Sequence, residues 1–102
     1  MSYSETLQRR VSTRMQTKIT GNVIWKTKSR NGVVVDLSED GICFQFHSDI
    51  GLRTGDEVII QSDELGFLNG VVRWTRGDRI GIKLQHSSNT VARIASYYRF
   101  FR

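Results

Sequence analysis

The chain has few of the residues that build disulfides and metal sites. Its 102 residues include one cysteine, Cys43, two histidines and no proline. A single cysteine excludes an intramolecular disulfide, and because Cys43 lies in an apolar, strand-like run we expect a buried free thiol. His47 and His86 lie far apart in the sequence, so the spacing typical of a metal site is missing.

Long apolar runs are missing as well. Hydrophobic residues make up 38% of the chain, and no run is long enough to span a bilayer. No basic segment followed by an apolar one is present at the N-terminus, as a secretory leader would require. We therefore expect a soluble cytoplasmic protein without a membrane span. Its length predicts one domain with a single small core that is rich in aromatic residues.

Acidic residues are scarce in the first 30 positions. The net charge of the chain is +5, and this segment carries seven lysines and arginines against Glu5 alone. Residues 1–8 are polar and show no apolar period, so we expect residues 1–16 to form a mobile basic arm. A basic arm of this kind indicates an anionic partner.

The remaining residues, 17–102, show the patterns of short strands followed by one helix. Apolar and polar residues alternate in several stretches, which are separated by turns that contain glycine. The predicted strands span residues 17–25, 33–35, 42–46, 57–61, 66–75 and 80–84. Strands of this number and spacing favour a mainly β fold, a closed antiparallel barrel with Greek-key-like connections.

Two turn signals refine this prediction. Gly21-Asn22 predicts a break or bulge within the first strand, since glycine is typical of bulges. Asn31-Gly32 predicts a hairpin turn before the second strand, because both residues accept the positive φ angles of such turns.

The apolar period changes from two to that of a helix after residue 86. Serine and asparagine at 87–89 supply N-caps, so a C-terminal helix is predicted over about 88–101. Tyr97 and Phe100 lie off its apolar face and are candidates for an exposed patch that contacts another protein. The predicted apolar face consists of Val91, Ile94, Ala95, Tyr98 and Phe101.

Three arginines, Arg9, Arg10 and Arg14, fall within six residues that contain no lysine. A guanidinium is planar and offers a fork of donors that matches phosphate oxygens or the O6/N7 edge of guanine. Lysine would supply the charge without this geometry. The cluster therefore favours forked recognition over general attraction to a polyanion. Two arginines at i and i+4 alone, however, are often only part of a solvated surface.

A second polar cluster, Asp36, Ser38 and Gly41, follows the predicted strand at 33–35. A carboxylate accepts hydrogen bonds from guanine N1 and N2 or braces an arginine, and a hydroxyl donates to a phosphate oxygen or to N7. Glycine permits a positive φ or a close approach to a ligand. Taken alone, this pattern is a common turn, but together with the arginines it suits an anionic ligand that contains guanine.

The two clusters resemble the motif of the PilZ domain, a bacterial receptor module for cyclic di-GMP. That motif is RxxxR, a gap, and then D/NxSxxG. Here Arg10 and Arg14 are followed, after the 21 residues 15–35, by Asp36, Ser38 and Gly41. The resemblance extends to the late strand pair and the terminal helix, and implies a six-stranded antiparallel barrel in a stand-alone, single-domain member of the family.

The resemblance also implies roles for single residues. In this family the arginines hold phosphates and guanine edges, and the second motif grips the ligand from the barrel surface. The residue before RxxxR, here Arg9, influences whether one ligand or a stacked pair is bound, and arginine favours the pair. An aromatic residue at the position of Trp74 lies against a guanine in some members. Its parity with Leu68 and Val72 fits core packing equally well.

We expect a cyclic di-GMP receptor that orders its arm on binding and signals to a downstream protein. No cofactor is expected, and no enzyme, because no nucleophile or acid–base set stands out. Two alternatives stay open. One is a PilZ-like adaptor that binds only proteins, which would not need three arginines at this spacing. The other is a basic barrel that binds single-stranded nucleic acid, for which exposed aromatics would be expected along several strands.

Overall fold

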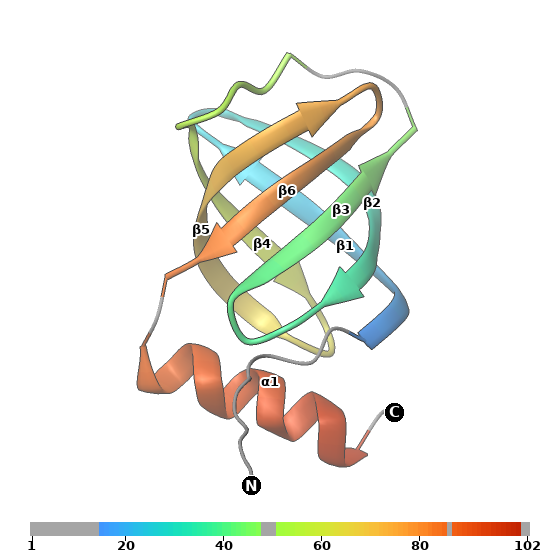
Figure 1. Ribbon diagram of the computed structural model, residues 1–102, viewed down its shortest axis with the longest axis vertical. Coiled ribbons are helices and arrows are strands. Elements are labelled where there is room, and N and C mark those ends of the chain that lie inside the picture. Colours follow the sequence, from blue (N-terminus) through green and yellow to red (C-terminus); the bar gives the residue numbers. More distant parts are fainter. Residues whose placement is uncertain (1–14, 48–50, 86, 101–102) are drawn as a thin grey trace, which may run out of the picture.

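The protein is a closed barrel of six strands with one helix at its end, as a computed structural model shows (Figure 1). The structure describes residues 15–47, 51–85 and 87–100. Neighbouring strands are all antiparallel, in the order β1-β2-β3-β6-β5-β4 around the barrel. The elements are β1 (Met15–Trp25), β2 (Lys28–Leu37), β3 (Gly41–Phe46), β4 (Glu57–Ser62), β5 (Gly66–Arg76), β6 (Arg79–Leu84) and α1 (Ser88–Phe100). The predicted fold class is therefore confirmed.

Alternating side chains fill the barrel. Since successive residues of a strand point to opposite faces, every second residue of a strand points into the core, and these positions are mostly apolar. In β3 the predicted apolar face is confirmed, with Ile42, Phe44 and Phe46 all buried. The rings of Phe44 and Phe46 contact each other with centroids 4.9 Å apart. Cys43, on the opposite parity, is also buried, as expected of a free thiol in this run.

The turn between β1 and β2 does not lie where the sequence predicted it. It falls at Lys26 and Thr27, and Lys26 takes the positive φ of 54°. Asn31 and Gly32 lie inside β2 instead, where Gly32 pairs with Gly21 of β1. The prediction of a turn at Asn31-Gly32 was wrong.

Gly32 is needed at its position for a different reason. A Cβ atom at this residue would collide with the carbonyl oxygen of Gln45 and with the ring of Phe44. The glycine thus makes room for the largest fully buried side chain of the barrel rather than for a turn. The predicted bulge in the first strand was also misplaced, because the register shift of β1 lies between Gln16 and Ile19, not at Gly21-Asn22.

The helix α1 covers the end of the barrel (Figure 1). Ser87 caps it, because its hydroxyl oxygen accepts a hydrogen bond from the backbone N–H of Thr90 at 3.1 Å. The buried face consists of Thr90, Ile94 and Tyr97, spaced at i, i+4 and i+7. Ala95 is exposed, so the predicted face was rotated by about one position.

Tyr97 was therefore wrongly predicted to be exposed, since it is 8% exposed in the structure. The polar residue Thr90 concealed the true apolar stripe; its hydroxyl is satisfied by that of Ser87 at 3.1 Å. The side chains of Phe100 and Phe101, which completed the predicted face and patch, lie outside the described part of the molecule.

Candidate functional site

The segment Asp36–Gly41 forms a tight turn between β2 and β3. The backbone N–H of Ser38 donates to the carbonyl oxygen of Gly41 at 2.9 Å. The hydroxyl oxygen of Ser38 accepts hydrogen bonds from the backbone N–H groups of Asp40 at 3.3 Å and Gly41 at 3.2 Å. The side chain is only 1% exposed. Ser38 therefore holds the shape of the turn from inside it.

Gly41 and Asp36 are the two other motif residues of this turn. Gly41 is buried as the first residue of β3, paired with Lys83. The glycines with a positive φ among the described residues are at 51, 55, 66 and 77, so Gly41 does not owe its place to a left-handed conformation. Asp36 is half-buried at the end of β2, with its Oδ1 atom buried.

A row of residues crosses the outer surface of four strands beside this turn. The register pairs Asp36 of β2 with Cys43 of β3, Cys43 with Gly81 of β6, and Gly81 with Trp74 of β5. Adjacent strands are about 4.8 Å apart, so the row is roughly 14 Å long from Asp36 to Trp74. We call these four residues the Asp36–Trp74 row.

Trp74 closes the row from the outside of the barrel. It is 42% exposed, so the interpretation of Trp74 as a core residue was wrong. A register shift between Val72 and Trp74 inverts the parity that placed both on one face. Its indole covers Gly81, since a Cβ added to Gly81 would collide with Nε1 and Cε2 of the ring. Trp74 thus offers one face of its ring to solvent beside a smooth backbone surface.

The arginine motif lies outside the described residues, but its distance from the row is limited by the chain itself. Gln16 of β1 pairs with Asp36, at the open end of the row. Arg14 precedes Gln16 by two residues, so their Cα atoms are at most about 7 Å apart. Arg10 is six residues away, within a reach of about 20 Å. The two halves of the motif are therefore tethered to the same end of the row.

One further cation stands next to the row. Arg79 is exposed and lies two residues from Gly81 on the outward parity of β6. Its Nη2 donates to Oε1 of Gln45 at 3.3 Å, and Nε2 of Gln45 donates to Oδ2 of Asp78 at 3.4 Å. The sequence reasoning did not select Arg79, although the alternation of Ile80, Gly81 and Ile82 would have placed it outward.

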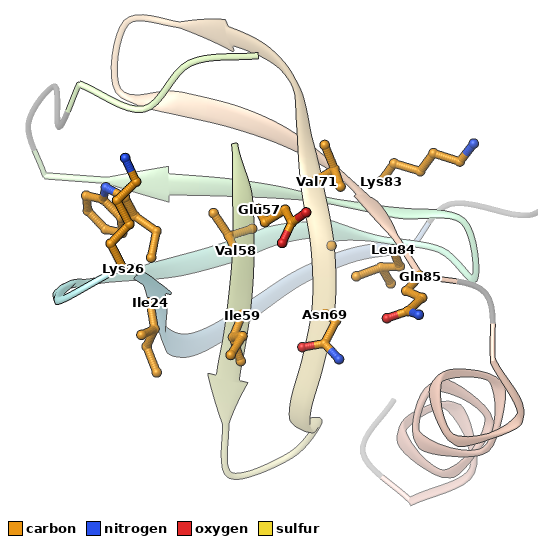
Figure 2. Close-up of a pocket in the computed structure, with 12 residues that line it drawn as sticks. Ile24, Lys26, Glu57, Val58, Ile59, Asn69, Val71, Lys83, Leu84 and Gln85 are labelled. Atoms are coloured by element: carbon orange, nitrogen blue, oxygen red, sulfur yellow. The ribbon is translucent and has the colours of Figure 1, made fainter. Parts of the chain in front are cut away.

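A hollow of the described surface lies elsewhere on the barrel. It has a volume of about 760 Å³ and is lined by residues of β1, β4, β5 and β6, and by none of the predicted ligand residues (Figure 2). Asp36 and Trp74 lie on the row and not in this hollow. Within the described residues no three metal-binding side chains cluster, and no helix is long and apolar enough to cross a membrane.

Comparison with known proteins gives the family. The model of the PilZ domain matches residues 8–100, so the chain belongs to the PilZ domain family, a family of receptor and adaptor domains. No curated protein matches the chain.

Two solved structures share the fold. The PilZ domain of CeSA from a cellulose-synthesizing bacterium superposes with a TM-score of 0.73 at 17% identity, over 89% of this chain and all of that one. MotI/DgrA, an inhibitor of motility from Bacillus subtilis, gives a TM-score of 0.67 at 13% identity over 91% of this chain. The match spans about half, 51%, of the length of MotI/DgrA.

The hydrogen bonds of Ser38 lead to a prediction about its role. Replacing Ser38 with alanine removes the acceptor for two backbone N–H groups, so we expect the free energy of unfolding to fall by about 1–2 kcal/mol. Urea denaturation measures this change. The exposed neighbour Glu39 provides a control, and Glu39→Ala should change stability by less than about 0.5 kcal/mol. An unchanged stability in Ser38→Ala would leave a direct ligand contact as the better account.

Proposed function

We propose that this PilZ domain is a cyclic di-GMP receptor whose N-terminal arm folds over the ligand. The observation that carries the proposal is the tether between the motif halves: Arg14 is two residues from Gln16, which pairs with Asp36. A ligand on the Asp36–Trp74 row would therefore lie within reach of the arginine forks.

Each residue has a part in this proposal. Arg10 and Arg14 hold phosphates and guanine edges through forked, charge-assisted hydrogen bonds. Asp36 accepts from the N1 and N2 donors of a guanine or braces an arginine, and Gly41 lets the turn approach closely. Ser38 acts through the shape of the turn. Arg9 favours a stacked pair of ligands, as the family resemblance implies.

Ligand binding would then be an ordering switch. In this proposal residues 1–14 are mobile without ligand and close onto the barrel with it, which creates a surface for a downstream protein. One structural relative is described as an inhibitor of motility, which supports an adaptor role. The ligand is an intracellular second messenger, so we place the receptor in the cytoplasm.

The open face of Trp74 fits a stacked guanine. We expect Trp74→Ala to weaken cyclic di-GMP binding by about 1–1.5 kcal/mol, roughly five- to tenfold, because the loss is one aromatic contact. Trp74→Phe should retain most of the affinity, since it keeps a ring at the same place. Equilibrium titration of both variants checks this. Equal affinity in Trp74→Ala and the parent would remove Trp74 from the site.

Isothermal titration with cyclic di-GMP at low and high salt tests the proposed function. The proposal predicts saturable binding, and the molar ratio reports whether a stacked pair forms. A cyclic dinucleotide has only two phosphates, so the salt dependence should be shallow, whereas single-stranded nucleic acid would give a steep one. A flat titration of folded protein would favour an adaptor that binds proteins alone.

A further inference from the structure

A second surface of the barrel carries exposed apolar side chains on β4 and β5. All four large apolar residues that are exposed in the described structure lie on β4 and β5. Three of them are not part of the Asp36–Trp74 row: Ile59 at 38%, Phe67 at 59% and Val71 at 40%. Ile59 pairs with Ile24 of β1 on the same outer side. Together with Glu57 and Lys83, these residues form what we call the Val71 face, and all of them except Phe67 are labelled in Figure 2.

The charges of this face have a particular arrangement. Val71 of β5 pairs with Glu57 of β4 on one side and with Lys83 of β6 on the other. Both charged side chains are exposed, and they stand about 5 Å to either side of Val71. The face therefore presents an acid, an apolar centre and a base in one line across three strands.

The line of Glu57, Val71 and Lys83 is complementary in charge to the same line on a second copy of the chain. Consider a second copy placed face to face, related by a two-fold axis that runs along β5 through Val71. The rotation exchanges the two sides, so Glu57 of each copy meets Lys83 of the other, and Val71 meets Val71. Phe67 also lies on β5 and would meet its own copy on the axis. Opposite charges thus meet twice around an apolar centre, which is the arrangement of a two-fold interface.

We propose that the Val71 face binds a second copy of this chain and forms a two-fold dimer. This inference does not depend on the ligand proposal, because it uses outward side chains of β1, β4, β5 and β6 and none of the arginines; Lys83 is the one residue of the face that neighbours the candidate site, as the register partner of Gly41. The face is limited to a few side chains on four strands, so the dimer should be weak and dependent on concentration.

Analytical ultracentrifugation of the whole protein at low salt tests the dimer. We expect a monomer–dimer equilibrium between about 5 and about 500 micromolar protein, a range that brackets small interfaces. Raising the salt should shift the equilibrium toward monomer, because the charge pairs are screened. A protein that stays monomeric over the whole range would overturn the proposal.

Charge reversal then identifies the face. Glu57→Lys places two lysines opposite each other, and Lys83→Glu places two glutamates opposite each other, so each single variant should raise the dimer Kd at least about tenfold. The double variant restores both pairs and should dimerise like the parent. Lys28→Glu, at the exposed tip of the β1–β2 hairpin, is the matched control and should leave the Kd within about twofold.

Mixing the two single variants gives the most specific test of the face. A Glu57→Lys chain facing a Lys83→Glu chain forms two opposite-charge pairs, so the mixture should associate although neither variant does alone. Retained dimerisation of the single variants, or no recovery in the mixture, would place the contact on another surface. Thermal melts of each variant at low concentration should match the parent, because both side chains are exposed.

Discussion

Replacing Arg14 with alanine is expected to weaken cyclic di-GMP binding by about ten- to a hundredfold, or 1.5–3 kcal/mol. Arg14 is the motif arginine with the shortest tether to the row, two residues from the partner of Asp36. A forked, charge-assisted contact from Arg14 to the ligand would be lost in this variant. Isothermal titration measures the change.

Lys18 provides the matched control for this variant. It is an exposed cation on β1, four residues after Arg14, and Lys18→Ala removes the same charge. We expect less than a threefold change in affinity, because lysine supplies only long-range attraction. If both variants lost affinity equally, net charge rather than forked recognition would govern binding. If Arg14→Ala bound as tightly as the parent, Arg14 would not contact the ligand.

Phe44→Ala should produce the largest loss of stability, about 3–5 kcal/mol in the free energy of unfolding. The side chain is fully buried, its ring contacts Phe46, and the room left by Gly32 is shaped around it. Truncation would leave a cavity that these neighbours cannot fill. Urea denaturation measures the loss, and Phe44→Leu serves as a milder variant should the alanine variant be unfolded.

Phe67→Ala is the matched control, since it makes the same chemical change at a ring that is 59% exposed. Its unfolding free energy should change by less than about 1 kcal/mol in dilute protein. A similar loss in both variants would mean that burial in the barrel is not what stabilises the fold.

The barrel could be predicted from the sequence because its inward face is regular. Ile80, Ile82 and Leu84 alternate with polar or small residues, and such a period has only one structural meaning over a short stretch. Asn31-Gly32 misled for a physical reason. Asparagine followed by glycine does favour a turn. Here, however, Gly32 is needed because a larger side chain would collide with Phe44, and that contact is not local in the sequence.

The sequence left Trp74 open between ligand contact and core packing and misplaced Tyr97, for the same physical reason. A bulge changes which side of a strand faces the core, and the residue types at Val72 to Trp74 give no signal of the bulge found there. The rotation of α1 depends on how Tyr97 fits the end of the barrel, which helical periodicity does not specify. Each error concerns a side chain whose place is set by packing between distant elements.

The candidate site divides in a similar way. The motif residues could be selected from their types and spacing, because the type of a residue determines its charge and its hydrogen-bonding capacity. The Asp36–Trp74 row could not, since it depends on the register of β2, β3, β6 and β5. Ser38 was selected as a ligand donor, but its hydroxyl faces the backbone of its own turn.

The most direct test of the account is a two-dimensional 15N NMR titration with cyclic di-GMP. The chain has two tryptophans, so Trp74 is observed beside an internal reference, the buried Trp25. We predict that the indole N–H signal of Trp74 and the amides of residues 36–41 shift, that amides before Arg14 become newly dispersed, and that Trp25 stays unchanged. Binding that leaves Trp74 and residues 36–41 unmoved would contradict the proposed site.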